Sequence, residues 1–321
     1  RGLPARRSEG GKCRRRAARA AGRVRSSPSL GSVRALAPVG PVTRADDRGR
    51  ASPVRIESTA NPRVRALLAL RDRRGRDAAD ATIVDGAREI GRAATAGAGM
   101  REIYVCPELV WTDEARATLA RLRRSARSLV EVSSTVLERI AFGDRTDGLV
   151  AVVDLPSTAL ASLELPASPL VLVVDGVEKP GNLGAILRSA DGAGVDAVIL
   201  TDPATDPYNP NAIRASLGTV FALPPAVAEP AAAIARLRSA GVRIVTARVD
   251  AERRYHEVDL TGPLAIVVGS EAEGLGAGWD GADLLPVRLP MLGLADSLNV
   301  SVAAAILLYE ARRQRDLAEH I

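Results

Sequence analysis

The sequence predicts an α/β protein made of two consecutive α/β units, the second of which contains a mostly parallel sheet. From residue 55 onward, apolar segments of strand length alternate with stretches of helical apolar periodicity. Residues 155–169 contain three prolines and no regular period, so we expect them to link two such series. The strands of the second series are uninterrupted apolar runs, which is typical of parallel strands buried on both faces.

The first unit is expected to alternate between strand and helix. We expect helices at 61–76, 87–96, 113–127 and 135–141, the first with an arginine-rich end. We expect strands at 82–84, 102–105, 129–132 and 149–153. This alternation in so short a stretch predicts a small α/β sandwich.

The second unit begins with the apolar run Leu170–Val174, which we interpret as a buried parallel strand. A polar loop follows, and we expect the next helix to begin at Asn182, a residue that favours the N-cap position. Further strands are expected at 197–200, 243–246, 264–268 and 287–289, with helices at 231–239 and 298–315.

The net charge of +6 originates in the N-terminal residues. Residues 1–50 carry 14 Lys and Arg and 3 Asp and Glu, a net charge of +11, which leaves −5 for the rest of the chain. This stretch has no apolar periodicity, so we expect residues 1–53 to be a disordered tail. Three interpretations of the tail stay open: an extension without function, a non-specific RNA-binding arm and an organellar transit peptide.

The composition argues against several classes of protein. The sequence has no window of eighteen uninterrupted apolar residues and no secretory signal pattern, so we expect neither a membrane span nor secretion. The two cysteines, Cys13 and Cys106, form no disulfide framework and no metal-ligand spacing. We therefore expect a cytoplasmic protein whose site needs no metal ion.

Three polar clusters stand out in the second unit. The first, residues 182–188 with the sequence NLGAILR, follows the first strand and its loop. The second, residues 269–275 with the sequence GSEAEGL, lies at the carboxyl end of a predicted strand, where ligands of open α/β sheets bind and where glycine lets the backbone approach them. Alone, the first also fits a capped helix with a solvated arginine, and the second an ordinary turn.

The third cluster begins with VRLPM at residue 287 and ends with DSLNVSVAAA at residue 305. Ser297, Asn299 and Ser301 interrupt the entry to an otherwise apolar helix, so their polar groups need partners wherever they are buried. We expect helix capping to account for Ser297 but not for all three.

In this order and spacing, the clusters resemble the three signature motifs of the SpoU, or TrmH-like, branch of the SPOUT RNA 2′-O-ribose methyltransferases. The matching positions are Asn182, Gly184 and Arg188 in the first motif, Gly269, Ser270, Glu271 and Gly274 in the second, and Pro290, Met291, Ser297, Leu298 and Asn299 in the third. Residues 209–221 are similar to the family segment between the first two motifs, through Arg214, Ser216 and Gly218. The likeness extends over most of residues 55–315, and the layout is most similar to the enzymes that act on ribosomal RNA.

The resemblance implies a division of the chain into four parts. These are the tail at 1–53, an RNA substrate-binding domain similar to ribosomal protein L30e at 54–154, a linker at 155–168, and a SPOUT methyltransferase domain with a deep trefoil knot at 169–321. In the second part, Asp85 departs from the glutamate that many relatives carry before the following glycine. A conventional Rossmann methyltransferase is disfavoured, because the sequence has no strand-linked G-x-G-x-x-G.

The resemblance also implies S-adenosylmethionine as methyl donor, without a metal ion, and a ribose 2′-hydroxyl as acceptor. Catalysis must then orient an in-line attack and remove the hydroxyl proton. Arg188 is implied to hold an RNA phosphate and stabilise the alkoxide, acting as a base only if the site removes its proton, and Asn182 and Glu271 to position the ribose or Arg188. The expected cofactor-binding residues are Gly269, Leu289, Leu298, Ser297, Asn299 and Thr246.

A nucleic-acid substrate needs positive charge near the site. The arginines around the first predicted helix supply it, namely Arg63, Arg65, Arg71, Arg73, Arg74 and Arg76. A solvated helix face is the alternative interpretation of this run. Aromatic residues are only 2% of the chain, so we expect recognition of RNA shape and backbone rather than extensive base stacking.

The helix predicted at 298–315 is apolar around much of its circumference. Burial within one subunit would explain this, but the resemblance implies a homodimer in which the helices after the first and third motifs pack against the partner. Two other functions stay open: a tRNA ribose methyltransferase of the same branch, and an RNA-binding or ribosome-assembly factor without catalytic activity. A pure binding module would have no need of the polar set Asn182, Arg188, Glu271, Ser297 and Asn299.

Overall fold

The structure, a computed structural model of the chain, describes residues 55–124, 126–142, 147–270 and 272–319, and the backbone of the short antiparallel strands β1 (Arg44–Ala45) and β2 (Ala51–Ser52). Residues 39–321 form one compact unit. The tail predicted at 1–53 lies almost entirely outside the described residues, as does Cys13. Among the helices that are described, none is long and apolar enough to cross a membrane.

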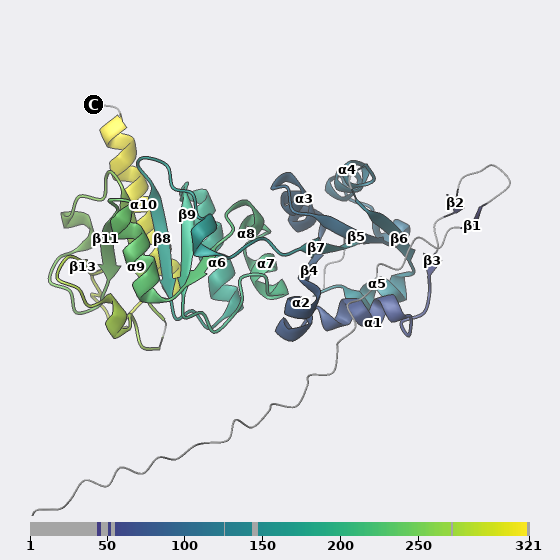
Figure 1. Cartoon of the computed structure of the whole chain (residues 1–321), viewed down its shortest axis with the longest axis horizontal. Coiled ribbons are helices and arrows are strands. Elements are labelled where there is room, and N and C mark those ends of the chain that lie inside the picture. Colours follow the sequence, from purple (N-terminus) through teal and green to yellow (C-terminus); the bar gives the residue numbers. More distant parts are fainter. Residues whose placement is uncertain are drawn as a thin grey trace, which may run out of the picture. The chain divides into compact units, whose positions relative to one another are not determined.

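A mixed sheet with helices on both faces forms the N-terminal module, which we define as residues 55–154 (Figure 1). The strand order is β3-β6-β5-β7-β4, in which β3, β6 and β5 run parallel and β7 is antiparallel to both β5 and β4. The strands are β3 (Arg55–Ile56), β4 (Ala81–Asp85), β5 (Met100–Val105), β6 (Ser128–Val132) and β7 (Leu149–Asp154). The helices are α1 (Pro62–Ala69), α2 (Arg73–Ala79), α3 (Ala87–Thr95), α4 (Asp113–Leu122) and α5 (Ser134–Ile140), with a 3-10 helix at Pro107–Leu109.

The single helix predicted at 61–76 is wrong, because the chain forms two helices, α1 and α2, with a break after Leu70. Arg76 explains the break. Its buried guanidinium donates to the carbonyl oxygens of Leu70 and Arg71, at 2.9 and 2.7 Å, and so satisfies groups that a continuous helix would bond internally. The helix predicted at 113–127 also ends early, at Leu122.

The C-terminal module, residues 169–319, contains a sheet whose described strands are all parallel, in the order β10-β9-β8-β12-β11-β13. This confirms the prediction of a mostly parallel sheet, and the central strands β8, β9 and β12 are buried along their whole length. The strands are β8 (Leu170–Asp175), β9 (Ala197–Thr201), β10 (Ala226–Ala228), β11 (Arg243–Ala247), β12 (Leu264–Val268) and β13 (Leu285–Val287). The helices are α6 (Pro180–Gly192), α7 (Pro210–Ala215), α8 (Thr219–Ala222), α9 (Pro230–Ser239) and α10 (Val300–Glu319).

The C-terminal module differs from the prediction at three places. The helix expected to begin at Asn182 begins at Pro180, a residue type suited to the first helical position, so Lys179 is the N-cap residue. The strand predicted at 287–289 lies two residues earlier, as β13. The sequence pattern does not predict α7, α8 or β10, because these elements are too short to show a period.

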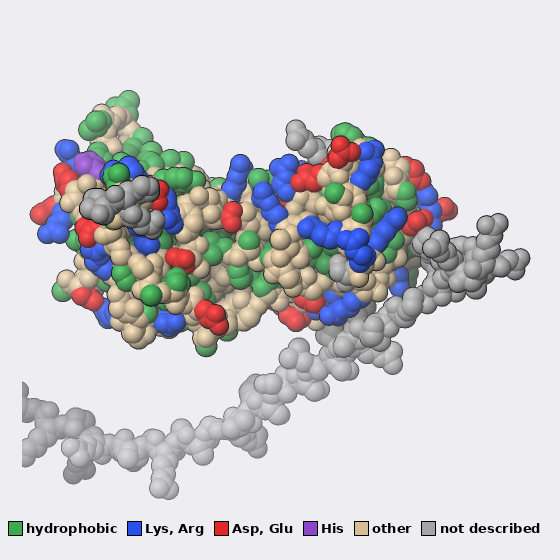
Figure 2. All heavy atoms as spheres, turned by 90° about the horizontal axis from the view of Figure 1, so that it is seen from above, with side chains coloured by type: hydrophobic (Ala, Val, Ile, Leu, Met, Phe, Trp, Pro, Cys, Tyr) green, Lys and Arg blue, Asp and Glu red, His purple; other side chains and the backbone are tan. Residues whose placement is uncertain are grey.

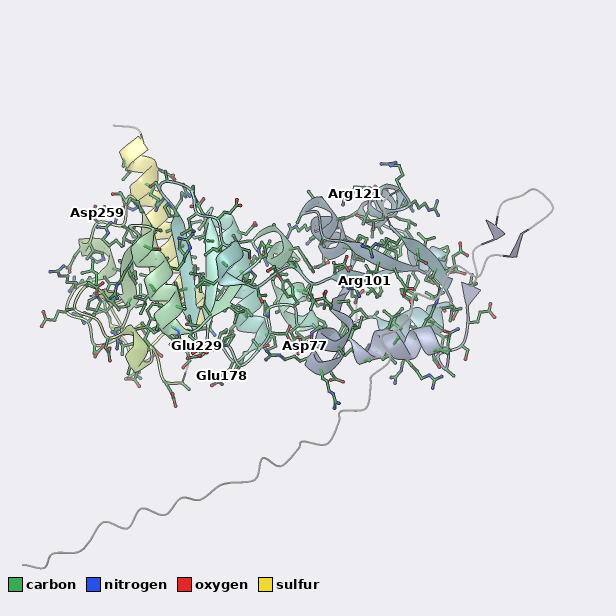
Figure 3. The ribbon with its side chains drawn as sticks, in the orientation of Figure 1. Asp77, Arg101, Arg121, Glu178, Glu229 and Asp259 are labelled. Carbon is green, nitrogen blue, oxygen red and sulfur yellow. The ribbon has the colours of Figure 1, made fainter. Side chains whose placement is uncertain are left out.

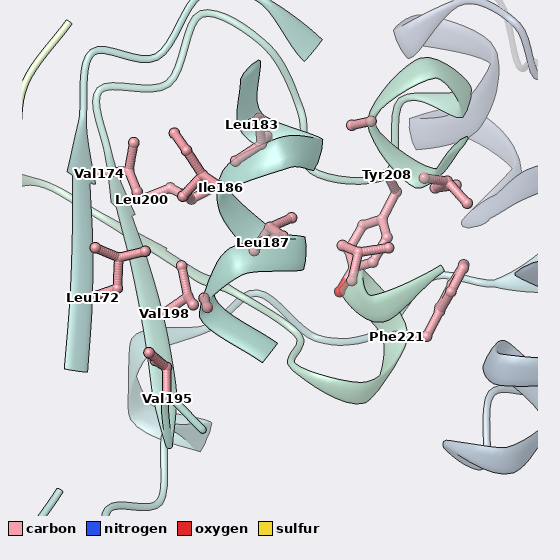
Figure 4. Close-up of a cluster of buried hydrophobic side chains, with 14 of the residues drawn as sticks. Leu172, Val174, Leu183, Ile186, Leu187, Val195, Val198, Leu200, Tyr208 and Phe221 are labelled. Atoms are coloured by element: carbon pink, nitrogen blue, oxygen red, sulfur yellow. The ribbon is translucent and has the colours of Figure 1, made fainter. Parts of the chain in front are cut away.

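One hydrophobic core runs through both modules. It contains side chains from α3 and α4, such as Ile90 and Leu122, and from β8 and α6, such as Leu172 and Leu187. Figure 4 shows the part between α6 and the sheet, with Tyr208 and Phe221 on the other side of α6. We name residues 203–222, which follow β9, the joint segment, because its helices pack against α6 on one side and against the N-terminal module on the other.

Polar contacts fix the N-terminal module to the joint segment. The Arg76 guanidinium, of which only 2% is exposed, forms an ion pair with the carboxylate of Asp206. Thr82 in β4 donates from its hydroxyl to the carbonyl oxygen of Tyr208 at 2.8 Å. Since both donors come from the N-terminal module and both acceptors from the joint segment, these contacts set where the module attaches.

Two residues of the family-like stretch 209–221 extend this attachment. Arg214 in α7 donates to the carbonyl oxygen of Phe142 and lies 3.9 Å from the carboxylate of Asp85, whose pKa burial raises to about 6. Gly218 has a φ of +80°, and a Cβ there would lie 2.9 Å from Cα of Glu89 in α3. Glycine at this position therefore permits both the backbone turn and the close approach of α3.

We expect the Arg76→Met substitution to lower the free energy of unfolding by about 3 kcal/mol, because it leaves Asp206 and two carbonyl oxygens without their buried partner. Urea unfolding followed by circular dichroism measures this. Arg74→Met is the matched control, because Arg74 is exposed, and it should change stability by less than about 0.5 kcal/mol. Equal losses in the two variants would show that the Arg76 pair does not stabilise the attachment.

Candidate functional site

Asp175 joins the loops that follow three neighbouring strands. β9, β8 and β12 are adjacent and parallel, so their carboxyl ends lie at one edge of the sheet, where ligands of such sheets bind. The buried carboxylate of Asp175, the last residue of β8, accepts from the hydroxyl of Thr201 at 2.6 Å and from the backbone N–H of Gly276 at 3.3 Å. Thr201 ends β9, and Gly276 lies in the loop after β12. One carboxylate therefore holds this edge together.

The second sequence cluster forms a tight loop after β12. Ser270 and Gly274 exchange two backbone hydrogen bonds, of 2.9 and 3.1 Å. A Cβ on Gly269 would overlap the peptide that joins Gly274 to Leu275, so only glycine fits the loop as it is folded. Glu271, predicted to take part in catalysis, lies outside the described residues.

The first sequence cluster lies on α6. A Cβ on Gly184 would lie 2.8 Å from the backbone nitrogen of Ser216, so this glycine lets α6 pack closely against α7 and the joint segment. Asn182 accepts at Oδ1 from the side-chain amide of Asn299 at 3.3 Å, which brings the first and third clusters together. Arg188 is exposed and forms no hydrogen bond or ion pair with the residues that the structure describes.

In the third cluster, Asn299 rather than Ser297 caps α10. Its Oδ1 accepts from the backbone N–H of Ser301 at 2.9 Å and from the Ser301 hydroxyl at 2.6 Å. The prediction that capping accounts for Ser297 is therefore wrong. Ser297 and Leu298 lie exposed in the segment that leads from β13 to α10.

Thr246 and Leu289 belong to the same edge of the sheet. Thr246 is buried in β11, next to β12, and Leu289 is half-buried just after β13. The backbone N–H of Arg248 donates to the carbonyl oxygen of Val287 at 2.9 Å, so the chain that leaves β13 runs along the loop that leaves β11. Two of the predicted cofactor-binding residues thus lie on adjacent chain segments, although about forty residues separate them in the sequence.

The predicted RNA-binding arginines divide into two groups. Arg71 donates to the carbonyl oxygens of Arg139 and Ala141, both at 2.9 Å, and lies 4.6 Å from the ring centre of Phe142. Like the buried Arg76, it uses its guanidinium within the fold, so we remove both from the RNA-binding set. The other four members are Arg65, Arg73 and Arg74, which are exposed, and Arg63, which is half-buried.

The prediction from sequence did not include Asp175, Thr201 or Gly276, although these residues shape the edge. The only available signal was a carboxylate directly after an apolar strand, a pattern that many loops share. Of the residues whose side chains are described, no group of three or more His, Cys, Asp and Glu is placed to hold a metal ion.

Chemically, the edge combines groups for two kinds of ligand. Backbone around Gly269, the amides of Asn182 and Asn299 and the side chain of Leu289 suit a polar ligand that also carries apolar surface. Arg188 lies on the same helix as Asn182, nearly two turns further along, and offers an exposed guanidinium suited to a phosphate.

Two protein families match the chain. The SpoU rRNA Methylase family matches residues 169–309, and the MRM3-like substrate binding domain matches residues 61–151. The first match spans the parallel sheet and all three clusters, and the second spans most of the mixed sheet.

This chain aligns with individual relatives over nearly their whole length. The 23S rRNA (guanosine-2′-O-)-methyltransferase RlmB of Bordetella pertussis is 37% identical over 70% of this chain and 94% of its own length. A crystal structure of an RNA 2′-O ribose methyltransferase is 42% identical, with a TM-score of 0.72, and the match covers 81% of this chain and 99% of the other. The SpoU methyltransferase AviRb of Streptomyces viridochromogenes, solved in complex with the cofactor AdoMet, is 30% identical, with a TM-score of 0.71, over 79% and 98%.

We expect Gly269→Ala to lower the free energy of unfolding by about 1–3 kcal/mol, because the added methyl group displaces the loop that closes against Gly274. Thermal unfolding followed by calorimetry measures the change. Gly181→Ala is the matched control, since a Cβ there meets no atom within 4 Å and alanine favours the helix. A Gly269 variant as stable as the Gly181 variant would contradict the loop geometry.

Proposed function

The chain belongs to the SpoU rRNA methylase family, and on that premise we propose that it transfers the methyl group of S-adenosylmethionine (AdoMet) to a ribose 2′-hydroxyl of 23S ribosomal RNA. The observation that carries this proposal is the set of relatives aligned over almost their full length. RlmB is named for 2′-O methylation of a guanosine in 23S rRNA, and AviRb binds AdoMet. The enzyme would act in the cytoplasm, on ribosomal RNA.

The residues at the carboxyl edge of the parallel sheet fit AdoMet. Gly269 has no side chain to obstruct the backbone there, Leu289 just after β13 and the exposed Leu298 would offer apolar contact, and the buried Thr246 would support the edge from β11. Ser297 and Asn299 would order the chain that leads into α10. When bound, AdoMet supplies an electrophilic methyl group, and the residues of this chain need no metal ion to hold it.

Arg188 would hold the RNA phosphate beside the reacting ribose and stabilise the negative charge that develops on the 2′-oxygen. An exposed guanidinium stays protonated in water, so this electrostatic role suits it better than that of a base. Asn182 would position the ribose from the first turn of the same helix, and its hydrogen bond to Asn299 would keep that position fixed relative to α10. Glu271 would assist Asn182 in holding the ribose or Arg188.

The finer fold assignments are part of this proposal. We assign residues 1–53 to a tail, 54–154 to an L30e-like substrate-binding domain, 155–168 to a linker and 169–321 to a SPOUT domain with a trefoil knot. The proposed knot requires the end of the chain to lie against earlier segments, and α10 contacts two of them. Arg315 donates to the carbonyl oxygen of Pro169 at 3.0 Å, and Gln314 accepts from the backbone N–H of Leu260 at 2.8 Å.

The enzyme would work as a homodimer through α6 and α10. Val302 and Tyr309, which are 46% and 52% exposed, lie seven residues apart and so on one side of α10, and Leu298, which is 38% exposed, lies just before the helix. Leu292 and Leu294, in the segment before α10, are almost fully exposed. Hydrophobic side chains gather on the side of the chain around α10 in Figure 2. Exposed apolar surface of this extent suits a symmetric interface beside the site.

The test of the activity is a comparison of 2′-O-methyl positions in rRNA and tRNA with and without the gene. A position in 23S rRNA that loses its methyl group on deletion, and regains it with the purified protein and AdoMet, supports the proposal. A tRNA position that responds instead would reassign the substrate, and no response in either RNA would overturn the activity.

Arg188→Ala should lower the methylation rate at saturating substrates by at least about a hundredfold, because it removes the group that stabilises developing charge. The affinity for AdoMet, measured by calorimetry without added metal, should stay within about twofold. Arg188→Lys keeps the charge without the planar fork and should retain an intermediate rate. Arg238→Ala, an exposed arginine elsewhere, serves as control. Loss of AdoMet binding in the Arg188→Ala variant would contradict the division of roles.

Val302→Glu should shift the protein from dimer to monomer. A charge placed between the exposed apolar residues Leu298 and Tyr309 cannot be buried against the same apolar surface of the partner subunit. Light scattering at micromolar concentration reports the mass. Val249→Glu is the control, since Val249 is 71% exposed in the loop after β11, outside α10 and the segment before it, and the substitution should leave the dimer intact. A wild-type protein with the mass of one chain and full activity would overturn the dimer.

A further inference from the structure

A basic groove lies between the N-terminal module and the joint segment. Its volume is about 740 Å³. From the N-terminal module it is lined by α3 and α4, which contribute three arginines, Arg88, Arg92 and Arg121. From the C-terminal module it is lined by α8, by the residues after it and by Asp191 of α6. The sequence prediction placed RNA at α1 and α2 and did not include this groove.

Two of the groove arginines are held in place without being neutralised. Arg121 donates to the hydroxyl of Thr95 at 2.9 Å and to the carbonyl oxygen of Gly91 at 2.8 Å. Arg92 donates to the carbonyl oxygen of Leu217, also at 2.9 Å. These acceptors are uncharged, so both guanidinium groups are oriented while their positive charge stays available. Such preorganised forks suit the oxygens of a phosphate.

The acidic residues of the groove leave a positive balance. Glu114 lies 3.4 Å from Arg88 and offsets that arginine, and Asp191 on α6 is the other lining carboxylate. Beyond the groove, Arg123 and Arg124 follow α4, are exposed and form no ion pair with any residue in the described ranges. Figure 2 shows Lys and Arg side chains gathered over the part of the chain that carries α3 and α4, and Figure 3 places Arg121 on α4.

The groove also leads to the proposed catalytic helix. Asp191 lies three residues after Arg188 in α6, so the two side chains are neighbours on one side of that helix. α8 packs against both α6 and α3. An extended anion lying in the groove therefore meets Arg121 and Arg92 at one end and approaches the exposed guanidinium of Arg188 at the other.

We propose that this groove binds the sugar–phosphate backbone of the RNA strand that continues from the methylated nucleotide. The inference rests on the proposed function for the identity of the RNA, and on the groove itself for the place of contact. Arg92 and Arg121 each bind a phosphate, and Arg123 and Arg124 extend the path along α4. The α1–α2 arginines are at most a second contact, because two of the six, Arg71 and Arg76, serve the fold.

The test measures binding of unmodified 23S rRNA, transcribed in vitro, to the full chain by filter binding over a range of salt. Arg92→Gln combined with Arg121→Gln should weaken binding by about tenfold and reduce the slope of log Kd against log salt by roughly 1.5, the change expected for two lost phosphate contacts. Glutamine keeps an amide donor for the acceptors that these arginines use. AdoMet binding, measured by calorimetry, should not change.

Three matched double variants control the result. Arg123→Gln with Arg124→Gln breaks no bond in the described fold, so a smaller loss in the same direction supports the groove even if the first variant is unstable. Arg238→Gln with Arg243→Gln removes the same charge from the C-terminal module, where Arg238 pairs with Asp283 and Arg243 with Asp259, which Figure 3 labels. This variant should have no effect. Arg65→Gln with Arg74→Gln tests the α1–α2 face. A loss of rRNA binding confined to that last variant would overturn the groove.

The outcomes separate this inference from the proposed function. If the wild-type protein binds rRNA through the groove arginines but does not methylate it, RNA binding in the groove is supported and the proposed methyltransferase activity is contradicted. If the wild-type protein methylates rRNA, and both groove variants bind rRNA with unchanged Kd and salt slope, the methyltransferase activity is supported and RNA binding in the groove is contradicted. Absence of rRNA binding by the wild-type protein would overturn the groove as well.

Discussion

The buried carboxylate of Asp175 is the constraint on which the site depends. A charged group that is removed from water must be met by donors, and here the donors come from the ends of two other chain segments, through Thr201 and Gly276. Satisfying one carboxylate therefore fixes three loops at once. The loop that carries Gly269 and the helix that carries Asn182 are adjacent to these fixed points, so their geometry is set by the sheet rather than by the ligand. A site built in this way is largely preformed.

The joint segment transmits that rigidity to the N-terminal module. Gly184 lets α6 pack directly against it, and Gly218 lets α3 pack against its other side. Both glycines therefore serve the same purpose on opposite sides of the joint segment, because a Cβ at either position would clash with neighbouring backbone. Two arginines then bond across this contact. Arg76 of the N-terminal module donates to Asp206 in the joint segment, and Arg214 of the joint segment donates to the carbonyl oxygen of Phe142 in the N-terminal module.

The sequence was informative wherever the cause of a structure is local. Uninterrupted apolar runs predicted the buried parallel strands, and helical periodicity predicted α3, α9 and α10 to within a few residues. It failed where the cause is distant. The break between α1 and α2 depends on the buried position of Arg76, whose guanidinium bonds to Leu70 and Arg71 nearby but also pairs with Asp206, 130 residues away. The resemblance found the three motifs, but only the fold shows that Asn182 meets Asn299, and no local signal distinguishes Asp175 from other polar residues at strand ends.

The position of the joint segment limits how the two modules of this chain can be exchanged. The surface that receives the substrate domain is encoded within the catalytic domain, between its first and second motifs, and it is shaped to one partner by a buried ion pair and a glycine contact. A substrate-binding module from another protein would lack the partners of these contacts unless residues 203–222 were exchanged with it. A change of target by exchange of modules therefore involves two separate stretches of this sequence, residues 55–154 and 203–222.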